Sequence, residues 1–292
     1  MRLDTPEGNL PPSRRAFAAS LFFAGYAPAA LSACASPVTT SSDELITEDI
    51  TFTGADGYAL PAYVARPAGQ GRHGAVIVVN EIFGVHEYIK DVCRRFAREG
   101  YVAIAPDYFD RAGDPAPLTD FAQITPIVAA TKFAQVMGDT SGAVSWLRGQ
   151  TFVNADAVGV TGFCWGGAVT WMAAAQTAHI KAAVAWYGRL TSVPADHWLY
   201  EEGRPWPVDV GAQLRAPVLG LYAENDSGIP VATVDEMRAA LAANGNPTGS
   251  EIVVYPGVAH GFHADYRESY NAEAAADGWA RALAWFRTHG VS

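Results

Sequence analysis

The sequence predicts an α/β fold, in which a mostly parallel sheet carries helices on both faces. Three observations support this prediction. Short, almost continuously apolar runs alternate with helical stretches along most of the chain, which is typical of buried parallel strands joined by crossover helices. Residues 162–166 read Gly-Phe-Cys-Trp-Gly, a nucleophile elbow with cysteine in the serine position. An aspartate and a histidine then follow two later strands, in the order typical of the α/β-hydrolase fold.

The first 35 residues have the features of an export signal. Residues 13–17 read Ser-Arg-Arg-Ala-Phe, which resembles a twin-arginine motif, and the apolar stretch over residues 16–30 is too short to span a bilayer. Cys34 ends a lipobox-like Leu-Ser-Ala-Cys, although ordinary signal cleavage near this point fits equally well. We therefore expect an exported protein, either periplasmic or lipid-anchored at Cys34. The alternative is a cytoplasmic protein with an apolar tail.

Residues 36–45 are expected to form a Ser/Thr-rich linker, and residues 46–292 to form one catalytic domain. Residues 50–53 and 59–65 flank Gly-Ala-Asp-Gly, which predicts a hairpin whose turn glycines have positive φ. Further strands are predicted at residues 75–79, 101–105, 157–161, 182–186, 218–222 and 252–255. Helices are predicted at residues 88–99, 127–147, 167–177, 231–243 and 271–288. In such sheets, functional residues gather at the carboxyl ends of the strands.

Composition excludes some classes of function. The formal net charge of −10 argues against nucleic acid or an anionic membrane surface as the main partner. Apart from Cys34, the cysteines are Cys93 and Cys164, and they lie in different contexts. Cys93 falls on the apolar face of the predicted helix at 88–99, so we expect a buried hydrophobic side chain and no disulfide. The His and acidic residues do not show the spacing of metal ligands, so we expect no metal, and we expect no organic cofactor.

Three strand ends supply a nucleophile, an acid and a base. Cys164 lies at the elbow, Asp226 follows the strand at 218–222, and His260 follows the strand at 252–255. A thiol nucleophile needs a base within hydrogen-bond reach, and that base needs a carboxylate to orient it and to stabilise its charged form. Glu224 is the rival acid in the same loop, and His263 is a near neighbour of the base. Taken singly, each member could also be an ordinary loop residue.

A fourth strand end supplies the rest of the site. Residues 80–85 read Asn-Glu-Ile-Phe-Gly-Val, directly after the strand at 75–79. This fold takes one oxyanion-hole N–H from such a loop and another from the residue after the nucleophile. Ile82 and Trp165 are therefore the expected donors. Glu81 places a carboxylate beside them, and its structural alternative is to cap the following helix.

These motifs together resemble the dienelactone hydrolases, or carboxymethylenebutenolidases. The resemblance extends over about residues 46–286 and depends on the Glu-Ile-Phe-Gly segment, the cysteine elbow, Trp-Tyr-Gly at residues 186–188, the Asp226 loop and Ala-His-Gly-Phe at residues 259–262. It implies a triad of Cys164, Asp226 and His260, with Glu81 hydrogen-bonded to the resting thiol. The family's best-known enzyme binds its substrate carboxylate with arginines, one of them four positions after the histidine.

The sequence departs from the family pattern at this last position, which is Ala264. Residues 194–210 also form a longer segment, rich in aromatic residues and proline, that could cover the site or simply pack locally. The candidate substrate contacts are Tyr187, Arg189, Tyr266 and Arg267.

The expected function is hydrolysis of a lactone or small carboxylic ester through Cys164. A general esterase or thioesterase using the same triad is one alternative. A non-catalytic exported binding protein is the other. A redox role is disfavoured, because the chain has no Cys-x-x-Cys motif.

Overall fold

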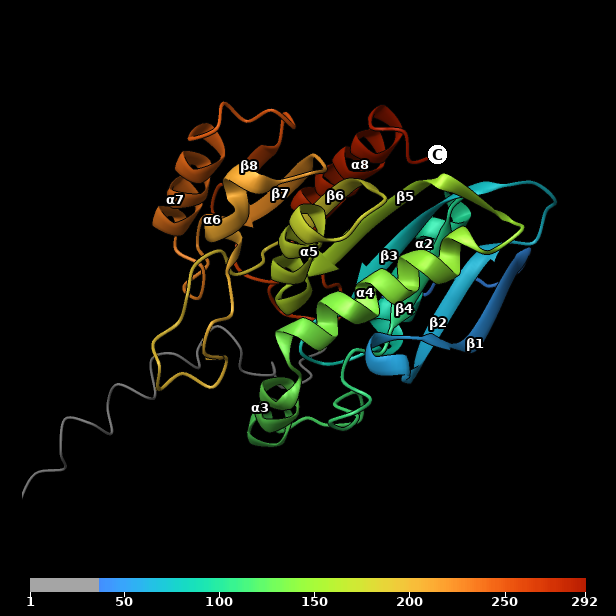
Figure 1. Ribbon diagram of the computed structural model, residues 1–292, viewed down its shortest axis with the longest axis horizontal. Helices are drawn as coiled ribbons and strands as arrows, with labels where there is room; N and C mark the ends of the chain where they lie inside the picture. The colour runs from blue at the N-terminus through green and yellow to red at the C-terminus, as the bar shows by residue number, and fades with distance from the viewer. Residues whose placement is uncertain (1–36) are drawn as a thin grey trace, which may run out of the picture.

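The computed structural model describes residues 37–292, so the export signal predicted over residues 1–35 lies outside the described residues. One eight-stranded sheet, in the order β1-β2-β4-β3-β5-β6-β7-β8, forms the centre of the domain (Figure 1). β1 (Leu45–Thr53) and β2 (Ala59–Pro67) form an antiparallel hairpin at one edge. The remaining strands run parallel to one another: β3 (His73–Val79), β4 (Val102–Pro106), β5 (Val153–Phe163), β6 (Ile180–Trp186), β7 (Val218–Ala223) and β8 (Glu251–Tyr255).

Helices cover both faces of the sheet, each over its own apolar core. α4 (Phe133–Arg148), α5 (Trp165–Gln176) and α7 (Val231–Ala242) pack on one face. α2 (Glu87–Arg98) and α8 (Ala272–Thr288) pack on the other. Trp171 and Met237 lie in the first core, and Phe96 and Phe286 lie in the second. This arrangement confirms the predicted α/β-hydrolase fold.

The hairpin turn differs from the prediction in one detail. Gly57 has the expected positive φ of 74°, but Gly54 is extended with φ of −86°, and Asp56 has the second positive φ of 56°. Gly54 is required for a different reason, because a Cβ atom there would lie 2.3 Å from Asp139 Oδ1. That same oxygen accepts a hydrogen bond from Ala55 N at 2.7 Å. The close approach therefore fastens the turn to α4.

The prediction of a single helix over residues 127–147 is wrong. The chain forms two helices, α3 (Phe121–Ala130) and α4, with extended backbone at Thr131 and Lys132 between them. Asp120 caps α3 by accepting a hydrogen bond from Ala122 N. The first amide of α4 donates to Glu201 Oε2 at 3.0 Å. Because that partner lies far away in sequence, the local pattern could not reveal where α4 begins.

The predicted linker is partly tied to the domain. Thr40 N donates a hydrogen bond to Asp91 Oδ1 at 2.6 Å, and Thr40 O accepts one from Arg94 Nε. Cys93, on the same helix, is fully buried as predicted, and burial raises the pKa of its thiol. No helix among residues 37–292 is long and apolar enough to cross a membrane.

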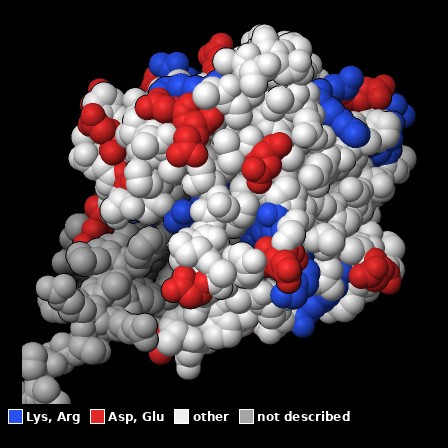
Figure 2. Space-filling view, turned by 60° about the vertical axis from the view of Figure 1, so that its left-hand side comes forward, with Lys and Arg blue, Asp and Glu red and all other residues white. Residues whose placement is uncertain are grey.

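The surface carries charges of both signs. On the face shown in Figure 2, Asp and Glu side chains lie among Lys, Arg and neutral residues. Short α6 (Pro207–Val210), two 3-10 turns (Ala55–Gly57 and Gly211–Gln213) and the loops at the carboxyl ends of the strands complete the described domain.

Candidate active site

Cys164 occupies a strained turn between β5 and α5. Its φ of 56° and ψ of −114° lie outside the ordinary regions for a side-chain-bearing residue. The neighbouring glycines make this turn possible. A Cβ atom at Gly162 would lie 2.2 Å from Gly166 O, and one at Gly166 would lie 2.4 Å from Val79 O. Cys164 N donates to Trp186 O at 3.0 Å, which holds the turn against β6.

Asp226 and His260 meet at the carboxyl ends of β7 and β8. His260 Nδ1 lies 2.6 Å from Asp226 Oδ2, and both side chains are buried. The second carboxylate oxygen accepts hydrogen bonds from Gly228 N at 2.9 Å and Ile229 N at 3.0 Å. Burial alone would raise the pKa of Asp226, but the charge of His260 and these hydrogen bonds outweigh it and lower the pKa. Asp226 is therefore held as a carboxylate.

His260 connects this carboxylate to the elbow. Burial alone would lower the pKa of His260, but the charges of Asp226 and Cys164, together with hydrogen bonds to both side chains, raise it to about 10. The structure thus brings together the three residues predicted as a triad. Tyr187, with a positive φ of 37°, packs its ring edge against the imidazole at a centroid distance of 5.1 Å. This buried ring supports the base from the side.

Glu81 is completely buried, yet its carboxylate is surrounded by polar partners. Tyr266 Oη donates to Glu81 Oε2 at 2.6 Å, His86 Nε2 lies 3.6 Å from the same oxygen, and Arg267 Nη1 lies 3.9 Å from Oε1. Burial would raise the pKa of Glu81, but these three neighbours outweigh it and lower the pKa. The hydrogen bond to the Cys164 thiol that the resemblance implies is not among the contacts of Glu81. Two predicted substrate contacts, Tyr266 and Arg267, instead surround this carboxylate.

A small recess lies directly over Cys164. Its volume is about 20 Å³, enough for about one water molecule. The lining residues are Ile82, Cys164, Trp165, Ala168, Arg189, Trp198, Leu199, Arg204 and Trp206. Both predicted oxyanion donors are therefore beside the nucleophile. Residues 194–206, here called the cap segment, supply Trp198, Leu199, Arg204 and Trp206 and so cover the site.

Two arginines bring positive charge to this recess. Arg189, a predicted substrate contact, donates through Nη2 to Gly228 O at 2.8 Å, in the loop that carries Asp226. Arg204 was missed by the sequence prediction, and its guanidinium carbon lies 4.5 Å from the centroid of the Trp206 ring. In both residues the Nε atom is buried without a hydrogen-bond partner in the described chain. Burial lowers the pKa of Arg204. In the sequence, the only signal for Arg204 was its place in a segment rich in aromatic residues and prolines. That signal did not show whether the side chain faces the site or solvent.

Neither arginine forms an ion pair with an acidic side chain of residues 37–292. Within the same described range, no group of three or more His, Cys, Asp or Glu residues is arranged to hold a metal ion. The side chains with polar groups that line the recess are those of Cys164, Arg189 and Arg204, together with three tryptophans, Trp165, Trp198 and Trp206.

The fold, elbow and buried Asp–His pair define an α/β-hydrolase. A model of the dienelactone hydrolase family matches residues 60–290, and the chain belongs to this family. Its relatives are hydrolases, so the protein is an enzyme of this type, and the binding-protein alternative is set aside.

Individual relatives match over most of their length. A Methylorubrum extorquens protein named "Putative carboxymethylenebutenolidase" is 46% identical over 282 residues, covering 96% of this chain and 94% of that protein. A crystal structure of a "Putative Dienelactone Hydrolase" from Klebsiella pneumoniae gives a TM-score of 0.77 at 46% identity, covering 83% of this chain and 98% of that one. A Bradyrhizobium protein, 32% identical over 84% of this chain and 96% of its own length, is named "Probable 2-oxo-3-(5-oxofuran-2-ylidene)propanoate lactonase".

Proposed function

We propose that Cys164 is the nucleophile of this hydrolase and that it cleaves a lactone or a small carboxylic ester. The observation that carries the proposal is the strained, glycine-flanked position of Cys164 within reach of the buried His260–Asp226 pair. A thiolate at the N-terminus of α5 is stabilised by the helix dipole, and an imidazolium beside it stabilises it further. The raised pKa of His260 favours such a thiolate–imidazolium pair.

The reaction follows from these positions. Cys164 Sγ attacks the carbonyl carbon, and the resulting oxyanion accepts hydrogen bonds from the backbone N–H groups of Trp165 and Ile82. The His260 imidazolium gives its proton to the departing alkoxide, which leaves an acyl thioester on Cys164. Neutral His260 then takes a proton from water as the water attacks the thioester. The carboxylic acid leaves and the thiolate returns, while Asp226 keeps the imidazole oriented throughout.

The recess favours a substrate that carries its own negative charge. An N–H donor that is buried without a hydrogen-bond partner costs free energy until an acceptor binds to it. Arg189 and Arg204 are partly buried and each has such a donor at Nε, which a carboxylate on the substrate would satisfy. The name of the Bradyrhizobium relative describes a lactone with a carboxylate, which supports the same substrate class. In this chain the binding arginines would be different residues from the one expected at position 264.

Substrate entry requires the cap segment to move. The recess of about 20 Å³ is too small for even a short ester, and Cys164 is 4% exposed. Glu201 ties the cap segment to the first amide of α4, and Trp198 packs its ring against Phe121 at a centroid distance of 5.7 Å. Glu201→Gln weakens the first of these contacts, so we expect it to speed alkylation of Cys164 by a bulky maleimide more than by iodoacetamide.

The nucleophile is tested by trapping its acyl intermediate. Wild-type protein is mixed with an aryl ester, and the reaction is quenched in acid. The protein is then digested, and the mass of the peptide containing Cys164 is measured by mass spectrometry. An acyl adduct on that peptide, absent from Cys164→Ala, is expected. Adducts on another residue, or full turnover by Cys164→Ala, would reject the proposal.

The substrate class is tested with matched pairs of compounds. A panel of lactones, aryl esters and thioesters, each with a free carboxylate and as the methyl ester, separates a lactonase from a general esterase or thioesterase. We expect the highest kcat/KM for a lactone with a carboxylate. Equal turnover of all pairs would favour the general-esterase alternative.

Export is proposed on the sequence alone, because residues 1–35 lie outside the described structure. Fractionation of cells that express the full chain tests it, with Arg14→Lys/Arg15→Lys as the matched control. Wild-type protein should reach the periplasm or membrane, and the double variant should stay in the cytoplasm. Labelling with a fatty-acid probe that requires Cys34 would identify a lipoprotein.

A further inference from the structure

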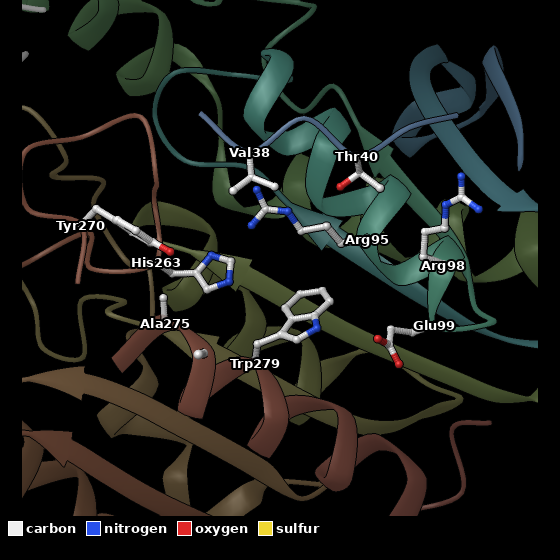
Figure 3. Close-up of a pocket in the computed structure, with 10 residues that line it drawn as sticks. Val38, Thr40, Arg95, Arg98, Glu99, His263, Tyr270, Ala275 and Trp279 are labelled. Atoms are coloured by element: carbon white, nitrogen blue, oxygen red, sulfur yellow. The ribbon is translucent and has the colours of Figure 1, made fainter. Parts of the chain in front are cut away.

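A second hollow, separate from the recess over Cys164, lies between α2 and α8. Its volume is about 340 Å³, which is in the range of small-molecule sites. The C-terminal half of α2 forms one wall and the first turns of α8 form the other, and residues 38–40 cross one side (Figure 3). The catalytic reaction described above does not use this groove. Its residues are therefore free to have another role.

One part of the groove is apolar and aromatic. Trp279 stacks on His263 at a centroid distance of 5.8 Å and an interplanar angle of 28°, and both rings line the hollow (Figure 3). Val38, at 53% exposure, and Tyr270, at 37%, are two of the few large hydrophobic residues of the described chain that face solvent, and both lie at this groove. Exposed apolar side chains that gather around a hollow are typical of a binding site.

The other part of the groove offers fixed hydrogen-bond donors. Arg95 donates from Nε to Asp91 Oδ2 at 2.6 Å and from Nη2 to Asp265, so two buried carboxylates fix its guanidinium group in place. The remaining nitrogen, Nη1, donates no hydrogen bond within residues 37–292. Glu99, farther along the groove, is paired with Arg287 at 3.2 Å, so its charge is partly compensated.

His263 adds a neutral donor beside Arg95. Burial and the charge of Arg95 lower the pKa of His263 to about 3, so the imidazole is uncharged at neutral pH. Its Nδ1 atom lies 2.6 Å from Tyr88 Oη. The pKa of that hydroxyl is raised well above its usual value, mainly by burial, so the phenol keeps its proton and can donate it to Nδ1. The ring proton of His263 then lies on Nε2, which has no partner among the described residues.

We propose that this groove binds a small, flat carboxylic acid. The carboxylate would accept hydrogen bonds from Arg95 Nη1 and His263 Nε2, and the hydrocarbon part would lie against Trp279 and the small side chains of Ala275 and Ala276. Carboxylic acids are also the product class of the proposed reaction. The binding claim depends on the groove alone, and the experiment below does not require Cys164 to be the nucleophile.

Occupancy of the groove has a path to the catalytic residues. His263 is three residues after His260 in the same loop. Tyr88 packs at a centroid distance of 5.2 Å from Tyr266, which donates to Glu81. A ligand on His263 would thus act on groups that touch the active site, and we expect it to change kcat.

The test uses benzoate as the probe and benzyl alcohol as its uncharged match, in titration calorimetry with the full chain at low salt. Ala276 is exposed on α8 and lines the groove, so it accepts new charges without disturbing the core. Ala276→Glu should weaken benzoate binding about threefold and Ala276→Lys should strengthen it about threefold, because a charge of either sign acts on the nearby carboxylate. Benzyl alcohol should bind far more weakly, and its affinity should be the same in both variants.

Arg204→Gln separates the two hollows. If benzoate binds the groove, this change in the recess leaves its affinity unaltered. Loss of binding in Arg204→Gln with no effect of the Ala276 variants would assign benzoate to the active site and overturn the proposal. Absence of benzoate binding would also overturn it, as would equal affinity for benzyl alcohol. If the wild-type enzyme hydrolyses its substrate through Cys164 but does not bind benzoate, the groove proposal fails while the proposed function stands.

Discussion

The recess over Cys164 and the groove between α2 and α8 differ in the ion pairs that their arginines form. In the groove, Arg95 is held by Asp91 and Asp265, and the hollow is wide and open to solvent. In the recess, Arg189 and Arg204 are partly buried, and neither forms an ion pair within residues 37–292, although Glu201 lies close enough to raise the pKa of Arg204. The guanidinium group in the larger hollow is thus held by two direct ion pairs, whereas the two beside the strained thiol have none. Size alone would have selected the groove, whereas the proposed nucleophile lies in the smaller recess.

The largest expected effect separates chemistry from binding. Cys164→Ala should lower kcat by more than about 1000-fold, because no other group can form the acyl intermediate. Benzoate affinity measured by calorimetry should not change, since the groove does not contain Cys164. If turnover survives, the recess loses its catalytic role. If benzoate affinity falls as well, benzoate binds beside Cys164 and not in the groove.

The next effect concerns substrate charge. Arg204→Gln should lower kcat/KM for a carboxylate-bearing lactone about 10- to 100-fold and have little effect on its methyl ester, because hydrogen bonds from charged donors are the stronger ones. Arg204→Lys retains the charge and should retain part of the preference. Equal losses for both compounds would indicate that Arg204 only supports the fold of the cap segment.

The free energy of unfolding tests the difference between an arginine with ion pairs, Arg95, and one without them, Arg204. Arg95→Gln leaves Asp265 without its cation, so we expect urea unfolding to show a loss of about 2–4 kcal/mol. Arg204→Gln removes a partly buried charge that forms no direct ion pair, and it should change stability by less than about 1 kcal/mol or even raise it. Similar losses in both variants would contradict the difference drawn between the recess and the groove.

A smaller effect depends on pH. The pKa of His260 is raised from 6.5 to about 10 in the folded state. Its stabilising contribution is therefore complete below about pH 6.5 and is lost as the pH rises towards 10. Asp226, whose pKa is lowered, stays ionised over this window. The stability of wild type relative to His260→Gln should fall by at least about 1 kcal/mol between pH 6 and 9.5, and a constant difference would show that His260 does not form a charged pair.

Much of the site follows from local sequence because the fold places strand ends together. Cys164 comes directly after an apolar run, and Asp226 and His260 lie in the loops that follow two others; parallel strands bring their carboxyl ends to one edge. The glycines around the elbow carried further information, since their spacing reflects contacts of 2.2 and 2.4 Å that exclude any side chain. The spacing of these glycines is therefore enough to predict the turn.

Other features depended on contacts between distant segments. The first amide of α4 takes its hydrogen-bond partner, Glu201, from the cap segment, and the position of Arg204 over Cys164 depends on how that segment folds back. The partners of Glu81 are a similar case, because Tyr266 and Arg267 come from a loop that follows a different strand. None of these contacts has a periodic or motif-like signal.

By itself, the sequence determined the α/β-hydrolase fold, the order of the candidate triad and the loop that carries the candidate oxyanion donor Ile82. These features follow from apolar periodicity and from backbone restrictions at glycine, which act over a few residues. Only the tertiary structure decided which hollow covers the thiol, which arginines lack partners and which groups surround Glu81. Those properties depend on burial and on the balance of charge across segments far apart in the chain, and no short stretch of sequence carries that balance.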